Sequence, residues 1–76
     1  MIKSTDLLSI GHLSERTGLS VSAIRYYEAQ GLIESERNKG GQRRFLRSDI
    51  RRLSFVQITQ QFGFSIEQIR NLLAGL

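Results

Sequence analysis

One arginine and two tyrosines lie together in the stretch SVSAIRYYEAQGLI, residues 20–33. At about 100° per residue, Ser22, Arg25, Tyr26 and Ala29 share one side of a helix. An arginine can bond two acceptors of guanine in the major groove, hydroxyls can reach phosphates, and small residues allow close approach. This combination favours a helix face that contacts double-stranded DNA.

The opposite side of this helix has the composition of a protein core. Val21 and Ile24 fall together, with Tyr27 at their border, so we expect Tyr27 mainly to pack. Glu28 lies on the same side and is expected to pair with an arginine of the hairpin predicted after this helix. The alternative for Arg25 is that its side chain simply covers a neighbouring tyrosine ring.

A basic block follows this segment and is a second candidate for phosphate binding. Residues 37–52 contain seven basic residues and one acid, a net charge of +6 within a total of +4, so the rest of the chain carries −2. Such a block is typical of a partner with a phosphate backbone. The alternative is a solvated charged loop.

Serines and glycines mark the elements that must position these groups. Four helices are predicted over about 10–17, 21–29, 49–62 and 66–74, with Ser9, Ser20, Ser48 and Ser65 as their N-caps. Ser65 also forms a capping box with Gln68, and Gly31 suits the left-handed position after the second helix. Residues 1–8 are predicted to be a flexible arm.

A basic hairpin is predicted between the second and third helices. Its strands are Leu32–Ile33 and residues 43–45, joined by the turn composition at 38–41. The helix at 49–62 is apolar around most of its circumference, so it should be covered on more than one side. The predicted fold is mainly α, a winged helix-turn-helix of four helices with a two-stranded hairpin wing between helices 2 and 3, over residues 9–76.

Composition argues against several other classes of protein. With no cysteine there is no disulfide or thiolate metal site, and His12 is the single histidine, without a ligand set or nucleophile around it. Gly40–Gly41 is not followed by the Lys-Ser/Thr of a phosphate loop. No run approaches the ~20 apolar residues of a membrane span. We therefore expect a cytoplasmic protein that is not an enzyme, with no cofactor or metal in this chain.

The motifs, taken together, resemble one family. They are Ile10-Gly11-x-Leu13-x-x-x-Thr17-Gly18, Ile24-Arg25-Tyr26-Tyr27-Glu28-x-x-Gly31-Leu32, Arg43-Arg44-Phe45 before Asp49, and Gly63-Phe64-Ser65-Ile66-x-x-Ile69. This set is similar to the DNA-binding domain of MerR-family transcriptional regulators over residues 9–73. Residues 37–45 look most like the redox-sensing, superoxide-response branch.

The resemblance implies that the second helix enters the major groove and that the wing touches flanking phosphates. It also implies a palindromic promoter operator, a homodimer formed through a long helix after this domain, an effector region beyond it, and possible contact with the transcription machinery. Phe45 stands where a tyrosine is common. The side chains predicted to contact DNA are Arg16, Ser20, Ser22, Arg25, Tyr26, Arg37, Lys39, Arg43, Arg44 and Phe45.

Two other functions remain open from the residues. A small adaptor could use the same fold to bind protein, and its basic face would then be dispensable for binding. An excisionase-like architectural DNA binder would use similar contacts for a different purpose.

Overall fold

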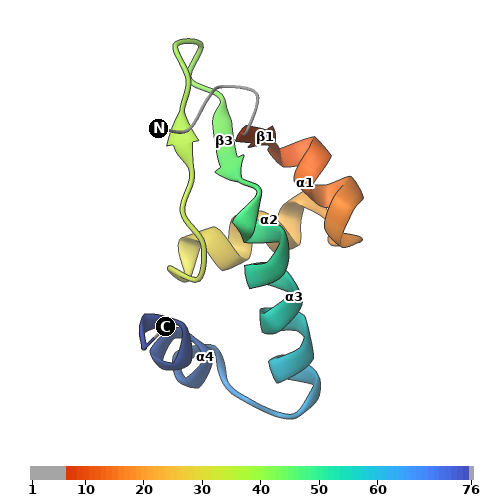
Figure 1. The fold of residues 1–76 in the computed structure, drawn as a ribbon, viewed down its shortest axis with the longest axis vertical. Coiled ribbons are helices and arrows are strands. Elements are labelled where there is room, and N and C mark those ends of the chain that lie inside the picture. Colours follow the sequence, from red (N-terminus) through yellow and green to blue (C-terminus); the bar gives the residue numbers. More distant parts are fainter. Residues whose placement is uncertain (1–6, 76) are drawn as a thin grey trace.

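The computed structural model describes residues 7–75, in which a small three-stranded sheet lies at one end of the molecule and the helices extend from it to the other end, where the last helix lies (Figure 1). The elements in order are β1 (Leu7–Ser9), α1 (Ile10–Thr17), α2 (Val21–Ala29), β2 (Glu36–Arg37), β3 (Arg43–Leu46), α3 (Ser48–Gln61) and α4 (Ile66–Ala74). The predicted mainly helical, winged helix-turn-helix fold is confirmed.

Three of the four predicted N-caps are present. The hydroxyls of Ser9, Ser20 and Ser65 each accept the backbone N–H three residues later, at 3.1 Å. The side chain of Gln68 accepts the N–H of Ser65 in return, which completes the predicted capping box. These bonds satisfy N–H groups that a helix leaves without partners, so the starts of α1, α2 and α4 follow from local sequence.

The fourth cap was predicted wrongly. Ser48 is the first residue of α3 rather than its cap, and Arg47, which precedes it, makes no side-chain capping bond. The carboxylate of Asp49 instead accepts the N–H of Leu46 at 3.1 Å, which holds the end of β3 against the start of α3. Asp49 is buried, and this burial raises the pKa of its carboxyl above the ordinary value of 3.8, although the Leu46 bond and Arg52 act in the opposite direction.

Replacing Asp49 tests this junction. Asp49→Ala leaves the N–H of Leu46 without its partner, and we expect the free energy of unfolding to fall by about 1–3 kcal/mol. Asp49→Asn keeps an acceptor and should lower the free energy of unfolding by less than Asp49→Ala does.

The pH dependence of stability tests the burial of the same carboxyl. Because the carboxyl of the wild type has a higher pKa in the folded than in the unfolded state, the stability of the wild type relative to the Asn variant should fall as pH rises from 3.8 through the raised pKa. Urea titrations across this range measure both effects; a stability difference that rises with pH would contradict the assignment.

The sheet has β3 at its centre, with β1 and β2 antiparallel on either side. Leu8 lies opposite Phe45, and Arg37 lies opposite Arg43. The strand predicted at Leu32–Ile33 is therefore wrong: both side chains are buried in the core, and the first wing strand begins later, at Glu36.

The predicted arm over residues 1–8 is wrong at its end. Leu7 and Leu8 belong to β1, and Leu8 is buried, so the two-stranded wing becomes a three-stranded sheet. Residues 1–6 lie outside the described residues.

One core joins all four helices to β3. Leu13, Ile24, Phe45, Leu53 and Ile69 are each 0% exposed and come from α1, α2, β3, α3 and α4 respectively. Helix α3 runs away from the sheet, and α4 folds back beside the C-terminal half of α3 (Figure 1). The core thus fixes α2 and the wing, the two elements predicted to contact DNA, in one body.

The expectation that α3 is covered on more than one side is met only in part. Val56 is buried, but Ile58 and Phe62 are exposed, as are Phe64 and Leu72 near the α3–α4 turn. Within residues 7–75, this end of the molecule carries an exposed apolar patch.

Candidate nucleic-acid interface

Helix α2 presents the predicted polar face to solvent. The side chains of Ser22, Arg25 and Tyr26 are exposed, Tyr26 by 50%, whereas Tyr27 is only 9% exposed. The Tyr27 hydroxyl donates a hydrogen bond of 2.6 Å to Oε1 of Gln60 on α3. The two tyrosine rings meet edge to face, with centroids 5.7 Å apart. The prediction that Tyr27 packs against the core while Tyr26 faces solvent is therefore confirmed.

The turn between α1 and α2 is held by its own hydrogen bonds. Gly18 adopts a left-handed conformation (φ 77°), which other residues rarely adopt. The Thr17 hydroxyl donates to the carbonyl of Leu13 at 2.8 Å and accepts the N–H of Leu19 at 3.2 Å. This fixed turn leaves Ser20 exposed at the N-terminal end of α2, where free N–H groups and the positive end of the helix dipole favour a phosphate.

The wing turn is organised by one asparagine. The side-chain oxygen of Asn38 accepts the N–H groups of Gly40 and Gln42, each at 3.0 Å. Arg37 donates to the carbonyl of Gly41 at 2.7 Å. Lys39 is exposed at the tip between these groups, so the turn is well suited to present its cation to a phosphate.

The three predicted contact residues of β3 have three different environments. Arg44 is partly exposed and donates to the side chain of Gln42 at 3.0 Å. Arg43 instead turns to Glu28, with Nε 2.8 Å from the carboxylate. This ion pair confirms the expectation that Glu28 pairs with an arginine of the hairpin.

Phe45 is a core residue. Its side chain is 0% exposed, so the predicted contact of its ring with DNA is wrong. Neighbouring strand residues point to opposite sides of a sheet, so Arg44 and Phe45 cannot both face the same partner. This alternation was the signal in the sequence that could have identified Phe45 as core.

Two arginines that the sequence did not single out hold the C-terminal end of α2. Arg52 of α3 donates to the carbonyl of Leu32 at 2.7 Å, and Arg70 of α4 donates to the carbonyl of Gln30 at 2.8 Å. Gln30 is the C-cap of α2, where carbonyls lack partners within the helix, and Leu32 lies two residues further along in the loop. Both arginines therefore act in positioning α2 within the domain.

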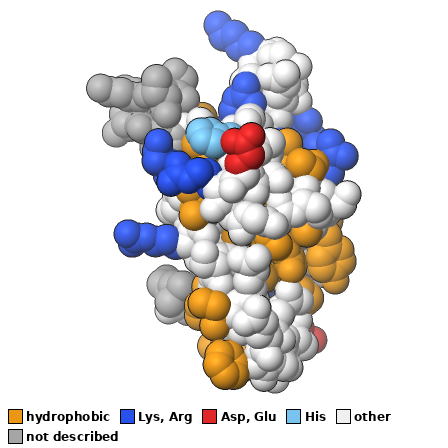
Figure 2. Space-filling view, turned by 90° about the vertical axis from the view of Figure 1, so that its right-hand side faces the viewer, with side chains coloured by type: hydrophobic (Ala, Val, Ile, Leu, Met, Phe, Trp, Pro, Cys, Tyr) orange, Lys and Arg blue, Asp and Glu red, His pale blue; other side chains and the backbone are white. Residues whose placement is uncertain are grey.

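The basic side chains are unevenly distributed over the surface. Figure 2 shows Lys and Arg side chains over the part of the molecule that carries the wing and α1, whereas hydrophobic side chains extend from there to the α3–α4 end, where no Lys or Arg is seen in this view. Arg16, also predicted to contact DNA, is exposed in the last turn of α1. The structure thus brings most of the predicted contact residues to the surface.

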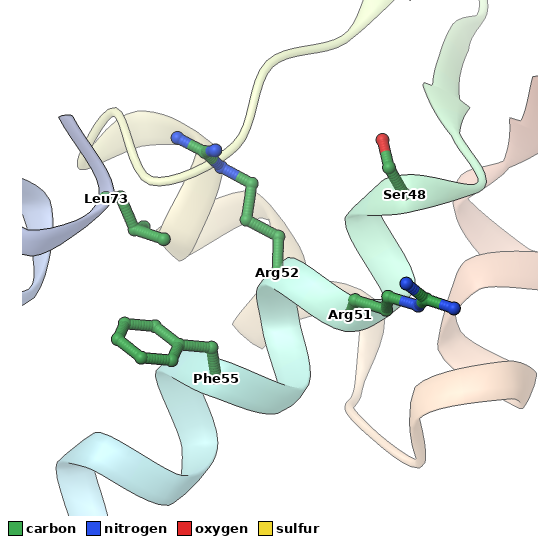
Figure 3. A pocket seen from close by; sticks show the side chains of 5 residues that line it. All are labelled: Ser48, Arg51, Arg52, Phe55 and Leu73. Atoms are coloured by element: carbon green, nitrogen blue, oxygen red, sulfur yellow. The ribbon is translucent and has the colours of Figure 1, made fainter. Parts of the chain in front are cut away.

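A hollow of about 270 Å³ lies between α3 and α4. Phe55 and Leu73 form one side of it, and the guanidinium of Arg52 is turned away toward the loop after α2 (Figure 3). Ser48 and Arg51 complete its lining. None of these residues belongs to α2 or the wing, so the hollow is separate from the candidate interface.

The described residues contain neither a metal-binding cluster nor a membrane-spanning helix. Within residues 7–75, His, Cys, Asp and Glu side chains form no cluster of three that could hold a metal ion. No helix in this part of the chain is long and apolar enough to cross a membrane. His12 is exposed on α1.

A model of the MerR HTH family of regulatory proteins matches residues 8–76. The chain belongs to the MerR family. The SoxR homolog of Chromobacterium violaceum, a transcriptional activator, is 46% identical over 69 residues, which cover 91% of this chain and 47% of the relative. The regulator HmrR of Rhizobium leguminosarum is 46% identical over 67 residues, covering 88% of this chain and 52% of the relative. This MerR-type chain therefore spans about half the length of its curated relatives.

Solved structures of MerR-family proteins have the same fold. HiNmlR, a MerR-family regulator lacking the sensor domain and bound to promoter DNA, matches with a TM-score of 0.78 and 28% identity, covering 90% of this chain and 55% of that one. A putative MerR-family regulator from Listeria monocytogenes matches with a TM-score of 0.79 and 41% identity, covering 88% and 52%. The narrower assignment to the superoxide-response branch stays a prediction, because HmrR matches as well as the SoxR homolog does.

Proposed function

We propose that this chain binds promoter DNA as the DNA-binding domain of a MerR-type transcriptional regulator. Helix α2 enters the major groove, and the wing lies on flanking phosphates. The observation that carries the proposal is the exposed face of Ser22, Arg25 and Tyr26 on a helix held in one body with a basic wing. The same fold is bound to promoter DNA in HiNmlR.

The contacts fall into two classes. Arg25 is the candidate for reading a base edge, since its guanidinium is exposed and makes no described bond within the domain. Phosphate contacts come from the other predicted contact residues whose polar side chains are exposed or partly exposed. These are Arg16, Ser20, Ser22, Tyr26, Arg37, Lys39 and Arg44. Arg43 is left out of both classes because its charge is paired with the carboxylate of Glu28. Arg37 and Arg44, by contrast, bond to neutral groups.

This domain matches about half of each of its two curated relatives. We propose that the whole regulator acts as a non-enzymatic homodimer in the cytoplasm, on a palindromic operator, with the transcription machinery as a further partner. The regulators it resembles are about twice as long as the matched region. A single recognition module buries only about 600–1,000 Å² of protein surface, so this domain alone should bind a half-site weakly.

The test is a titration against a duplex that the protein itself selects from a random-sequence library, compared with an unselected duplex. We expect tighter binding to the selected duplex and a log K that falls linearly with log salt. An architectural binder would show equal affinity for both duplexes, and an adaptor would bind neither; either result would refute the proposal.

The wing contacts can be counted in the same assay. In the double variant Lys39→Gln, Arg44→Gln, two phosphate contacts are lost, so the salt slope should shrink by roughly 1.8, about 0.9 per contact. Arg51→Gln removes one exposed arginine of α3 beside the hollow, outside α2 and the wing, and serves as a single-charge control with an unchanged slope. Equal slopes for the double variant and the wild type would show that the wing does not contact phosphate.

A further inference from the structure

Both oxygens of one carboxylate on α2 are occupied by the two ends of the wing. Oε1 of Glu28 accepts Nε of Arg43 at 2.8 Å, and Oε2 accepts the hydroxyl of Ser35. Arg43 is the first residue of β3, and Ser35 directly precedes β2. Glu28 thus joins the wing, at the base of both its strands, to the last turn of α2.

Strand β3 of the wing is held by its pairing with β1 and by Phe45 in the core, but β2 and the turn have few other contacts that fix their direction. Strand β2 is only two residues long, both exposed, and the turn that follows is also exposed over residues 38–42. The side chains of Arg43 and Glu28 are only 29% and 21% exposed. Partly buried pairs are screened by salt less than surface pairs are, so this contact persists under conditions that weaken the surface charges around it.

We propose that Glu28 is a positioning residue for DNA binding, which sets the distance and angle between α2 and the wing. Glu28 lies three residues after Arg25 and two after Tyr26 on the same helix. A wing fixed to this helix reaches its phosphates while Arg25 is in the groove; a wing that swings must be ordered during binding, which costs affinity. The inference rests on the proposed function, because it concerns how that function is achieved.

The sign of the effect separates this role from simple electrostatics. An acid close to DNA repels phosphate, so removing its charge should strengthen binding if charge were all that mattered. The positioning role requires the opposite result. Glu28→Ala and Glu28→Gln remove the same charge, but only Gln retains a side-chain oxygen that can accept from Ser35 or Arg43. The two variants therefore have the same charge and differ in whether residue 28 can still accept hydrogen bonds from the wing.

Binding to the selected duplex is the first measurement. We expect Glu28→Ala to weaken binding about tenfold and to reduce the salt slope, because wing contacts are lost, while Glu28→Gln retains most of the affinity. Ser35→Ala, which leaves every charge in place, should weaken binding in the same direction. Glu36→Gln removes a neighbouring exposed acid as a control and should leave binding unchanged or tighter. Circular dichroism confirms that each variant is folded at the assay temperature.

The second measurement needs no DNA. The chain contains no cysteine, so Glu15→Cys on α1 and Lys39→Cys at the wing tip allow two spin labels to be placed uniquely. We expect the distance distribution between the labels to broaden in Glu28→Ala and to stay narrow in Glu28→Gln. An unchanged distribution in Glu28→Ala, or equal tightening of DNA binding by both variants, would overturn the proposal. If the wild type selects no duplex, the proposed function fails, while the label distances still decide whether Glu28 holds the wing.

Discussion

Replacing Phe45 by alanine should unfold most of this domain. The ring is fully buried in the core formed by β1 and the helices. Phe→Ala substitutions in a core reduce the free energy of unfolding by about 3–5 kcal/mol. A chain of this length has a thin stability margin, and with no cysteine it has no disulfide to add to that margin. Thermal melts by circular dichroism measure the loss.

The controls for Phe45 separate packing from contact with DNA. Phe45→Leu keeps an apolar side chain and should fold with a smaller loss of stability than Phe45→Ala. If Phe45→Ala instead melted like the wild type and only bound DNA more weakly, the ring would be a contact residue and the description of the core would be wrong.

Arg25→Ala should produce the largest loss of sequence discrimination. A side chain that reads a base edge contributes about 1–3 kcal/mol, so affinity for the selected duplex should fall roughly 5- to 150-fold, with a smaller loss on unselected DNA. Arg25 is exposed on α2, so its removal should leave the melting temperature nearly unchanged. Titrations of both duplexes at one salt concentration provide the comparison.

Tyr26→Phe is the companion variant for Arg25. It removes one hydroxyl from the same exposed face, and if that hydroxyl meets a phosphate, binding to both duplexes should weaken alike. An equal loss on both duplexes for Arg25→Ala would move Arg25 into the phosphate-contacting class and leave base reading to another residue.

Local sequence determined the helices and the two faces of α2. A serine cap is a bond across three residues, and a helical face follows from a repeat of 3.6 residues, so both can be read from a short stretch. The exposed Ser22, Arg25 and Tyr26 and the buried Tyr27 were predictable for this reason. Ser48 was the exception, because the carboxylate of Asp49 holds that junction instead of a serine hydroxyl.

The sheet and the wing were decided by pairing between distant residues. Leu8 is a strand residue because Phe45, 37 positions later, lies opposite it, and nothing near Leu8 in the sequence indicates that partner. Leu32 and Ile33 have the composition of a strand, yet burial in the helical core removes them from the wing. Whether an apolar pair becomes strand or core depends on which surface it meets, and that surface exists only in the folded chain.

The roles of the arginines show the same limit. By composition Arg43 and Arg44 are interchangeable, but Arg43 is bound to Glu28, 15 residues earlier, and Arg44 stays partly exposed beside Gln42. A basic block indicates a phosphate partner because net charge acts over a distance, whatever the fold. Which cations face that partner and which hold the domain together is set by short-range geometry, and only the tertiary structure brings those groups within bonding distance.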